Sequence, residues 1–586
     1  MSGRKIKKGG SDKPLKAKRD RAEEIANIFE WLITAFILAF VFRAFVMEAF
    51  RIPTGSMADT LKGAHFRLRC RQCGYEYAYG FNPGSFGLKD DTIPSGYAPL
   101  PRTKCPSCGY SNAPGMPMPV ANGDRILVLK CIYQFFEPRR WDVIVFKNPT
   151  DPNINYIKRL IGLPGEAVHI IDGDIYIDGQ IARKPPKVQE ELWMPVYNND
   201  YQPVDQYTAI YNGNRWEPPF SRSDYSQWSI DDSSTTLFHL DSAENKIDLL
   251  HYDPKITNDF RPTYAYNSLN TYKDMPYCSD LMVRFYCRRT SEKGSIGISL
   301  SKYQSFYKAW IDFSGAMVIT KTTEGEEEIE LARKTIEPPI ADSLKQTPVK
   351  FANIDHQLIF EYGDEKLTFD MGRAPEDAGS IRAIIRPKVE IFGSGKLTLS
   401  HVAVFRDIHY TSESYNGNRG RAADKLFQLE DDEYFVLGDN SPNSEDCRWW
   451  RAPGIPNKSI APLLLSIDSK YERNFEKRFI PDELRQEFER NHVSLSEHID
   501  ISEVQRGFAW LITNDMKEYL VKKENGKLNV YLSPYRVGIV PRDYLVGKAL
   551  FVYWPSGFRP FDQFPLGIIP NVGLMRFIYG GSNDYH

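Results

Sequence analysis

Hydrophobic and polar residues alternate with a period of two in several segments of the chain, and one run near the N-terminus is apolar throughout. This run covers residues 31–42 without a charge, and a weaker apolar pattern extends over residues 25–47. A helix over the wider span reaches about 30 Å at roughly 1.5 Å per residue, which is enough to cross a bilayer. The pattern predicts one transmembrane helix followed by a mostly β protein.

The apolar run is interpreted as an uncleaved signal anchor. A cleaved signal peptide is the alternative, because the uncharged core is short and the preceding residues are basic. However, no A-x-A site followed by a mature start occurs before Arg43, and the following FVMEAFRIP is itself apolar. The positive-inside rule then keeps the basic tail in the cytoplasm and sends everything after Phe50 across the membrane.

Strand-like alternation recurs in short blocks that are far apart in the sequence. The blocks lie at residues 123–130, 139–149, 155–166, 433–450 and 537–554, and the fourth runs into a polar turn. Each is an ordinary β element when taken alone.

The region 187–413 contains closely spaced alternating runs such as DLMVRFYCR, SIGISLS and KLTLSHVAVFRDIHY, separated by Gly, Pro and Asp turns. This spacing predicts an antiparallel β-sandwich. The pattern resembles concanavalin-like or laminin-G-like jelly rolls, which implies a carbohydrate or protein ligand; a folded platform without a ligand is the alternative. Trp216, Trp228 and Trp310 are candidates for stacking on sugars, although core packing explains most such residues.

Composition narrows the function class. The chain has 586 residues, of which 42% are hydrophobic and 13% aromatic, so it can form several cores; about three or four domains are expected. The 74 basic residues nearly balance the 76 acidic ones, and the net charge of -2 predicts no nucleic-acid partner. None of the ten histidines forms H-E-x-x-H, so metalloproteolysis of that kind has no support.

A candidate nucleophile follows the anchor directly. The string RIPTGSMADTL, residues 51–61, places Ser56 on a Gly-containing turn at the membrane surface. Gly-Ser turns are common, and Lys158 in the block 155–166 is, in isolation, an ordinary strand lysine. Neither residue alone predicts an activity.

Taken in order, these strings resemble the conserved boxes of bacterial type I signal peptidase, the serine-lysine leader peptidase. The resemblance spans the anchor and five blocks, ending with VPRDYLVGKALFVYW. It implies that Ser56 is the nucleophile and that Lys158, in the KR-x-x-GLPG block, is the general base. It also assigns the oxyanion hole to the Ser56 backbone N–H and the Thr54 hydroxyl.

The late block GDNSPNSEDCR supplies the supporting residues that the resemblance implies. Ser444 corresponds to the serine that orients the lysine, Asp446 and Arg448 correspond to an ion pair, and Gly438 and Asp439 open the block. The chain departs from many relatives in this block, at Ser441, Pro442 and Cys447, and in the nucleophile segment, at Thr54, Ala58 and Asp59. We expect altered loop geometry at these points and retained activity.

The chemistry requires a lysine that can lose its proton. A free lysine has a pKa of about 10.4, and burial in an apolar site can lower it by about 3–5 units. The neighbours of Lys158 in the sequence, Tyr156, Ile157, Leu160 and Ile161, are apolar enough to provide such a site. A neutral amine near Ser56 can then act as a base.

The resemblance implies a serine endopeptidase of the bacterial cytoplasmic (inner) membrane, single-pass, with its N-terminus cytoplasmic and its catalytic domain extracytoplasmic. It implies cleavage of signal peptides from translocated preproteins after small residues, through an acyl-enzyme on Ser56, with membrane lipid as a partner and no cofactor for catalysis. The alternative is a membrane-anchored binding protein with a decayed peptidase core, whose activity resides in the β-sandwich. A self-cleaving repressor is disfavoured by the anchor and by the lack of a recognisable DNA-binding helix pair.

Four cysteines form two matching motifs, CRQCGY and CPSCGY, with Cys70, Cys73, Cys105 and Cys108. Paired CxxC turns followed by glycine are typical of tetrahedral zinc, so we expect a structural zinc ribbon. Two disulfides or a redox pair are the alternatives, which an extracytoplasmic location favours. The other cysteines show no metal spacing, and a Cys278–Cys287 bridge is a further hypothesis.

A third insert contains a predicted short helix at residues 479–490 and a hairpin turning at Asn525 and Gly526. The apolar C-terminal stretch is interrupted by Pro570 and Gly573, so no second membrane helix is predicted. The predicted division is a basic cytoplasmic tail (1–24), the signal anchor (25–47), the peptidase core (48–62, 119–186, 414–470 and 532–586), a zinc-ribbon-like insert (63–118), the β-sandwich insert (187–413) and a small α/β insert (471–531).

Overall fold

The computed structural model of the protein describes residues 21–88, 97–149, 151–207, 209–211, 213–230, 236–253, 259–267, 275–338, 344–374, 384–413, 419–423, 425–450, 538–555 and 572–581, together with the strands at 455–456, 495–499, 508–513, 518–524 and 527–532. These elements are mostly strands, which confirms the prediction of a mostly β protein. The tail up to residue 20, the helix expected at 479–490 and the turn residues Asn525 and Gly526 lie outside the described residues.

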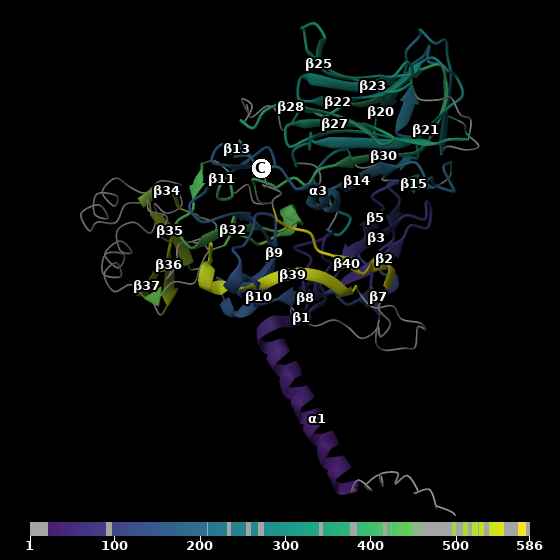
Figure 1. The fold of residues 1–586 in the computed structure, drawn as a ribbon. Coiled ribbons are helices and arrows are strands. Elements are labelled where there is room, and N and C mark those ends of the chain that lie inside the picture. Colours follow the sequence, from purple (N-terminus) through teal and green to yellow (C-terminus); the bar gives the residue numbers. More distant parts are fainter. Residues whose placement is uncertain are drawn as a thin grey trace, which may run out of the picture.

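A long N-terminal helix projects away from the rest of the protein (Figure 1). It consists of α1 (Arg21–Val41) and a π-helical continuation, η1 (Phe42–Val46). Among the described residues, the stretch Ile25–Val46 is the one long and apolar enough to cross a membrane, and its window is not buried by other parts of the chain. The helix ends one residue earlier than predicted, because Met47 already pairs with Leu129 in a sheet.

The blocks that were predicted as separate strands assemble into one 8-stranded sheet. Its order is β1 (Met47–Arg51), β8 (Arg125–Leu129), β39 (Leu545–Trp554), β9 (Val143–Asn148), β10 (Asp151–Gly162), β32 (Glu433–Leu437) and β38 (Val540–Pro541), with β40 (Arg576–Phe577) paired to β39. β10 begins before the predicted block and ends at Gly162, where a Cβ atom would lie 2.5 Å from the Val168 side chain. Sequence segments hundreds of residues apart thus form a single layer.

A smaller antiparallel sheet lies beside this layer and shares its core. Its strands are β13 (Gln180–Ile181), β12 (Asp174–Ile177), β11 (Ala167–Ile171) and β31 (Phe427–Gln428). Phe146 and Leu160 of the large sheet pack in one buried cluster with Val168, Ile175 and Phe427. The burial of these apolar side chains stabilises the two sheets as one unit.

The cysteine motifs lie at the turns of a third region. It contains the sheet β3 (Glu76–Gly80), β2 (His65–Arg69), β7 (Pro117–Ala121) and β4 (Tyr97–Pro99), the pair β5 (Thr103–Lys104) and β6 (Ser111–Asn112), and the 3-10 helix η2 (Pro83–Phe86). Its core includes Phe66 and Leu100, and Tyr211 and Trp216 of the following large region pack into the same cluster. The two regions therefore share a core.

Two large antiparallel sheets occupy the end of the molecule opposite α1 (Figure 1, teal). The first contains β18 (Trp228–Ile230), β19 (Leu237–Asp241), β30 (Lys396–Arg406), β21 (Leu281–Arg289), β26 (Thr347–Ile354), β27 (Gln357–Tyr362), β28 (Glu365–Asp370) and, paired to β30, β14 (Met194–Asn198). The second contains β17 (Phe220–Arg222), β20 (Asp248–Tyr252), β29 (Val389–Ser394), β22 (Ser295–Lys302), β23 (Ser305–Asp312), β24 (Ala316–Thr323) and β25 (Ile329–Thr335).

Apolar side chains from both large sheets form one buried cluster, including Trp228, Val283, Ile298 and Phe351. Trp216 and Trp228 are buried, so they pack in cores and are not available to stack on a ligand. The helix α3 (Pro186–Leu192) leads into this region, and the short pair β15 (Ile210–Tyr211) and β16 (Asn214–Arg215) lies near its start.

A 5-stranded sheet contains β33 (Ile455–Pro456), β37 (Lys527–Leu532), β36 (Glu518–Glu524), β35 (Phe508–Thr513) and β34 (Leu495–Ile499). Glu524 pairs with Lys527, as the hairpin predicted in this region requires.

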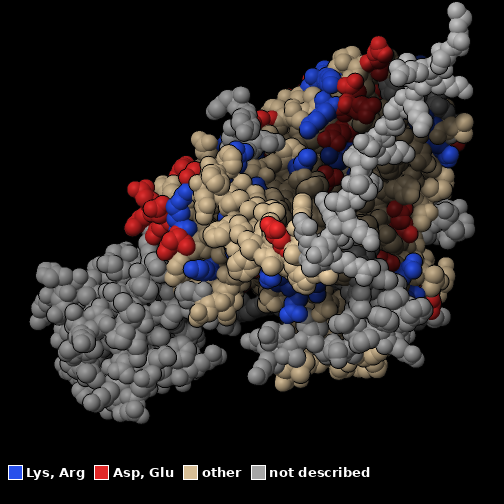
Figure 2. All heavy atoms as spheres, turned by 60° about the horizontal axis from the view of Figure 1, so that its bottom comes forward, with Lys and Arg blue, Asp and Glu red and all other residues tan. Residues whose placement is uncertain are grey.

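Figure 2 turns the α1 end of the molecule toward the viewer. On the described part of this face, basic and acidic side chains lie in small separate groups among uncharged ones. The visible described surface therefore has no continuous basic stripe of the kind that tracks a nucleic-acid backbone.

Candidate active site

The predicted nucleophile lies on a short turn that follows β1. Within this turn the Ala58 N–H donates to the Gly55 carbonyl at 3.0 Å, and the Leu61 N–H donates to the Met57 carbonyl at 2.7 Å. Met57 and Leu61 are buried in a cluster with Ile126 and Val143 of the 8-stranded sheet. These apolar anchors hold the turn on the sheet and leave the Ser56 side chain half-buried.

Lys158 reaches this turn from β10. The strand register places Lys158 opposite Ile144 of β9, and the lysine Nζ lies 2.8 Å from the Ser56 Oγ. The lysine is only 3% exposed. Its Nζ also donates to the Ile157 carbonyl at 3.2 Å and lies 5.0 Å from the centre of the Tyr156 ring. The structure thus brings together two residues that are 102 positions apart.

Burial lowers the pKa of Lys158 to about 8. The negative charges of Asp446 and Glu445 oppose this shift, as does the Tyr156 ring face, which attracts a cation. Desolvation is the larger effect because the amine is removed from water. About a tenth of the lysine is then neutral near pH 7, so a base is available at physiological pH.

The ion pair predicted in the late block is present. The Arg448 Nη2 lies 2.7 Å from the Asp446 Oδ2, and neither side chain is exposed. The same carboxylate oxygen accepts a hydrogen bond of 3.0 Å from the Gly438 N–H. Arg448 also donates to the Thr411 carbonyl at 2.7 Å and to the Ser441 Oγ at 2.8 Å. This network fixes the conformation of the late block and joins it to Thr411.

Position 438 requires glycine, because neighbouring atoms lie too close to leave room for a Cβ atom. A Cβ atom at this position would lie 2.1 Å from the Ser444 Oγ and 2.5 Å from the Ser56 carbonyl oxygen. The Ser444 hydroxyl is buried and, among the described residues, has no hydrogen-bond partner. The expected contact with Lys158 is therefore not formed in this structure, and the orienting role of Ser444 stays a prediction. Thr54 lies on the exposed side of the turn.

Arg159 was missed by the sequence analysis and neutralises Asp439. Its Nε and Nη2 lie 2.8 and 2.7 Å from the two carboxylate oxygens, and both side chains are unexposed. Burial opposes the charge, but Asp439 outweighs it and raises the pKa of Arg159. The available signal was the adjacent basic pair Lys158 and Arg159 in an apolar strand, whose alternation points the two side chains to opposite faces.

Three residues of the large insert also reach this site, and no motif in the sequence indicated them. The Tyr264 hydroxyl donates to the Asp439 carbonyl at 2.8 Å, and the Tyr266 hydroxyl donates to the Ala64 carbonyl at 2.9 Å. The Asn267 amide pairs with that of Asn440. The insert is therefore in direct contact with the residues around Ser56.

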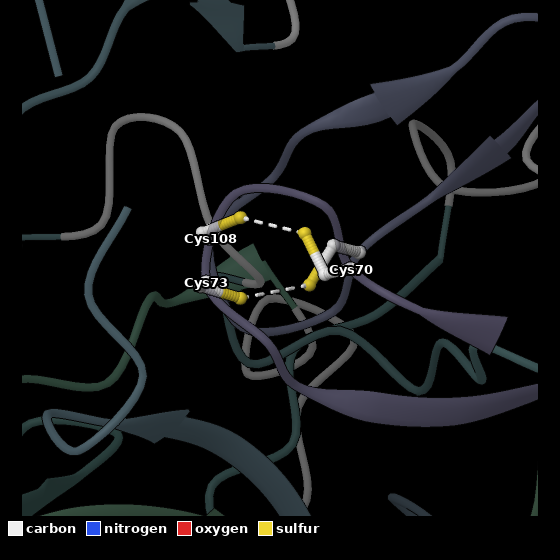
Figure 3. A group of neighbouring side chains, drawn as sticks. Cys70, Cys73 and Cys108 are labelled. Atoms are coloured by element: carbon white, nitrogen blue, oxygen red, sulfur yellow. Dashed lines mark hydrogen bonds between the residues drawn. The ribbon is translucent and has the colours of Figure 1, made fainter. Parts of the chain in front are cut away.

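The four cysteines of the CxxC motifs converge. One sulfur from each lies within 4.8 Å of all the others, and the pairs Cys70–Cys108 and Cys73–Cys105 are each 3.6 Å apart. Figure 3 shows the labelled side chains of Cys70, Cys73 and Cys108 directed toward one another. A tetrahedral zinc with Zn–S bonds of about 2.3 Å separates its sulfurs by about 3.8 Å, which fits this arrangement.

The two motifs have the same backbone conformation. The Gly74 N–H donates to the Cys70 carbonyl at 2.9 Å, and the Gly109 N–H donates to the Cys105 carbonyl at 3.0 Å. Both glycines have left-handed φ angles, 75° and 79°, which glycine adopts without steric cost. The two turns are thus structural equivalents, as the repeated sequence suggests.

The cysteines are free thiols in the structure, and this includes the four of the CxxC motifs. The hypothesis of a Cys278–Cys287 bridge is wrong here: both thiols are free and buried. The alternative of two disulfides within or between the CxxC motifs is likewise not what the structure contains.

Four buried aspartates form a second cluster: Asp174, Asp280, Asp355 and Asp407. The Lys184 Nζ lies 2.5 Å from Asp355 and 2.8 Å from Asp407. The Lys302 Nζ lies 2.5 Å from Asp280 and 3.7 Å from Asp174. Burial raises the pKa of Asp407 to about 6 and raises that of Asp174 as well. This buried ion-pair cluster joins the smaller sheet to the large insert through its own lysines.

Comparison with protein families agrees with the geometry around Lys158. Residues 110–216 match the family described as "Signal peptidase, peptidase S26". This stretch contains the lysine strand β10 but not the Ser56 turn.

Curated relatives extend the match. The chain is 30% identical over 151 residues to a signal peptidase I of Rickettsia canadensis, covering 25% of this chain and 42% of that protein. It is 35% identical over 141 residues to that of Rickettsia prowazekii, covering 24% and 39%, and 30% identical over 144 residues to that of Pseudomonas fluorescens, covering 24% and 34%. The matched stretch spans less than half the length of these relatives. The matches confirm the resemblance to bacterial type I signal peptidase.

Solved structures resemble the chain only distantly. The carbohydrate-binding module CBM66 from Bacillus subtilis is 9% identical, with 32% of this chain and 94% of that chain covered and a TM-score of 0.20. The Bacillus licheniformis β-glucanase is 7% identical, with 35% and 96% covered and a TM-score of 0.21. Similarity this low supports no argument, and a ligand of the large insert stays a prediction.

Proposed function

We propose that the chain is a membrane-anchored signal peptidase I that removes N-terminal signal peptides from translocated preproteins after small residues. The observation that carries the proposal is the 2.8 Å contact between the buried Lys158 amine and the Ser56 hydroxyl. The peptidase S26 match and the names of the relatives support the general class.

Catalysis begins when neutral Lys158 accepts the proton of the Ser56 hydroxyl. The serine oxygen then attacks the carbonyl carbon of the scissile peptide bond and forms a tetrahedral intermediate. The hydrogen bond from Lys158 to the Ile157 carbonyl and the packing of Lys158 in its strand restrict where the amine can point. The lysine therefore stays aimed at the serine.

The negative charge that develops on the substrate oxygen requires hydrogen-bond donors. The Ser56 N–H is free of other partners in the described part of the chain, and the exposed Thr54 is on the same turn. We assign these two groups to the oxyanion hole. A donor of this kind contributes about 3–4 kcal/mol to stabilisation of the transition state.

Collapse of the intermediate breaks the peptide bond. The Lys158 ammonium gives its proton to the leaving amine of the mature protein, and the signal peptide stays bound to Ser56 as an ester. Lys158, again neutral, then takes a proton from an incoming water, whose oxygen attacks the ester. The signal peptide is released as a carboxylic acid, and Lys158 returns the proton to the Ser56 oxygen.

The location of the reaction follows from the N-terminal helix. We infer that Ile25–Val46 crosses the bacterial cytoplasmic membrane once, with the basic tail in the cytoplasm and Ser56 on the far side. The nucleophile would then lie ten residues after the helix, near the membrane surface where signal peptides emerge. We also infer that the cysteine region and the two large sheets are inserted domains of zinc-ribbon and β-sandwich type.

The test is cleavage of a preprotein with an A-x-A site by the purified, detergent-solubilised full chain, with and without added lipid. Ser56→Ala and Lys158→Ala are each expected to lose at least about 10³-fold in kcat/KM, or roughly 4 kcal/mol of transition-state stabilisation. Lys130→Ala is the matched control, because this lysine directly follows β8 of the same sheet and pairs with Glu48.

The proposal is overturned if the wild type is inert with lipid present, or if either variant cleaves as fast as the wild type. An active variant would mean that the catalytic residues are misassigned, whereas an inert wild type would favour the alternative of a binding protein with a decayed peptidase core. The large insert would then be the region in which to search for activity.

We also propose that Cys70, Cys73, Cys105 and Cys108 hold a structural zinc ion, because their sulfur separations fit a tetrahedral site. Elemental analysis of the purified chain should find about one zinc, and Cys70→Ser combined with Cys105→Ser should abolish it. Cys131→Ser, outside the cluster, should retain the metal. Full occupancy in the double variant would reject the assignment.

A further inference from the structure

The segment 259–267 of the large insert lies against the nucleophile turn. Tyr264 and Tyr266 are buried in one small cluster with Ala58, which is two residues after Ser56, and with Ala78 of the cysteine region. This segment is more than 190 residues from Ser56 in the sequence and is not in any of the peptidase blocks. The insert thus contributes side chains to the surroundings of the nucleophile.

The main connection is a reciprocal pair of side-chain amides. The Asn267 Nδ2 donates to the Asn440 Oδ1 at 2.7 Å, and the Asn440 Nδ2 donates to the Asn267 Oδ1 at 2.8 Å. Both side chains are buried, at 7% and 0% exposure. Because a buried amide without a partner is costly, each residue fixes the rotamer of the other.

Asn440, whose rotamer is fixed by Asn267, also forms hydrogen bonds to the nucleophile turn. Its side-chain Nδ2 also donates to the Gly55 carbonyl at 2.9 Å, and its backbone N–H donates to the Ser56 carbonyl at 3.1 Å. The two peptide groups on either side of the Ser56 Cα are therefore both held by Asn440. Their orientation sets where the Ser56 hydroxyl and the Ser56 N–H point.

Tyr266 packs against the nucleophile turn at Gly55 and is held there by two hydrogen bonds. Its hydroxyl donates to the Ala64 carbonyl at 2.9 Å, and its backbone carbonyl accepts from the Gly80 N–H at 2.9 Å. A Cβ atom on Gly55 would lie 2.1 Å from the Tyr266 ring. The absence of a side chain at Gly55 thus allows the insert to contact the turn, in addition to allowing the turn to form.

We propose that Asn267 is a positioning residue of the peptidase, which acts through Asn440 to keep the Ser56 turn in its reactive orientation. The large insert is thereby part of the catalytic machinery and not only an appended domain. The inference rests on the proposed function, because it concerns the same serine and lysine. It also predicts a structural effect that can be measured without any activity.

The activity test compares Asn267→Ala with Asn353→Ala in the detergent-solubilised full chain. Asn353 is the matched control, since it is a fully buried asparagine of the same insert whose side-chain atoms have no hydrogen-bond partner among the described residues. We expect Asn267→Ala to lower kcat by about 10- to 100-fold with little change in KM, because misplacing a reactive group has effects of that size. The pH midpoint should stay unchanged, because Lys158 keeps its surroundings.

A double-mutant cycle with Asn440→Ala separates positioning from general damage. If Asn267 acts through Asn440, the loss in the double variant should be clearly smaller than the product of the two single losses. Multiplicative losses, or an Asn267→Ala variant with the kcat of Asn353→Ala, would overturn the proposal.

Hydrogen exchange supplies the readout that does not depend on activity. Backbone amides of residues 54–61 should exchange faster in Asn267→Ala than in Asn353→Ala, because the turn loses its support. If the wild type proves inactive but this difference is present, the proposed function fails, whereas the support of the Ser56 turn by Asn267 stands. Equal exchange in the two variants overturns the inference, whatever the activity.

Discussion

Three lysines in two regions of this protein have side chains that are buried to nearly the same extent, yet their pKa values shift in opposite directions. At the candidate active site, desolvation lowers the pKa of Lys158 to about 8. In the buried ion-pair cluster, burial also opposes the charge, but the aspartates outweigh it and raise the pKa of Lys184 and Lys302. Burial alone therefore does not produce a basic amine.

The difference is in the arrangement of the carboxylates. Lys184 and Lys302 are each within salt-bridge distance of two aspartates. Aspartates are also present near Lys158, but Asp446 is paired with Arg448 and Asp439 with Arg159. The arginines compensate the negative charge that would otherwise hold a proton on Lys158. The proposed role of Lys158 as a base thus depends on nearby carboxylates that are already paired with arginines.

Disrupting the buried ion-pair cluster should have the largest effect on the free energy of unfolding. Lys184→Met leaves Asp355 and Asp407 buried without their cation. We expect a loss of about 3–5 kcal/mol in the free energy of unfolding at neutral pH, measured by denaturant unfolding. The raised pKa of Lys184 means that this contribution is present below its unfolded pKa and is lost only in strong alkali.

Lys350→Met is the control for that loss, because Lys350 pairs with Glu361 at 2.8 Å on a more exposed part of the insert. Surface pairs of this kind contribute less than about 1 kcal/mol. Equal losses in the two variants would contradict the importance of the buried cluster.

A lysine-to-methionine substitution at the candidate active site, Lys158→Met, should stabilise the fold instead of destabilising it. The pKa of Lys158 is lowered from 10.5 to about 8, so below pH 8 the folded protein carries an ammonium that costs about 3 kcal/mol. Lys158→Met removes that cost and should stabilise the fold by up to this amount at neutral pH, while it abolishes activity. Unfolding curves of both proteins at several pH values measure the difference.

The pH dependence makes this prediction specific. As pH rises from about 8 to 10.5, the unfolded chain binds more protons than the folded one, so the wild type gains stability. The advantage of Lys158→Met should therefore disappear above that range. A constant advantage, or a loss at neutral pH, would show that Lys158 is not a desolvated lysine.

Removing Arg448, which neutralises Asp446, should raise the pKa of Lys158, as the aspartates raise that of Lys184. In Arg448→Met, the Asp446 carboxylate loses its partner and interacts more strongly with the lysine ammonium. The midpoint of the kcat/KM profile should move upward by at least about one pH unit, which lowers activity near pH 7 by roughly tenfold.

Arg333→Met tests whether such a shift is specific, because Arg333 forms an exposed ion pair with Glu330 in the large insert. Its pH profile should match that of the wild type. A shifted midpoint in this variant, or an unshifted one in Arg448→Met, would contradict the proposed role of Arg448.

The smallest expected effect is the pH dependence of the wild type itself. With a Lys158 pKa of about 8, the neutral fraction rises about fivefold between pH 7 and pH 8. kcat/KM for preprotein cleavage should follow this rise and level off at higher pH. Activity that falls over this range would mean that an ammonium, and not an amine, is the active form.

Local sequence determined much of the protein. The uncharged run ahead of Arg43 was sufficient to predict the N-terminal helix, and the paired CxxC turns predicted the convergence of their four cysteines. Ser56 and Lys158 were found through a resemblance carried by short blocks, and the structure places them in contact. Each of these signals lies within a few consecutive residues, where spacing and periodicity determine the local structure.

Other features were decided only by the tertiary structure. Arg159 and Asp439 are 280 positions apart, and Asn267 and Asn440 are 173 apart, so no local pattern relates them. Whether a buried lysine is a base or an ion-pair partner depends on which charges the fold brings within a few ångströms. The sequence by itself therefore determined many of the elements and the candidate reactive residues. Long-range packing decided the charge states of these residues and the contacts that support them, because Coulomb and hydrogen-bond energies depend on distance in space.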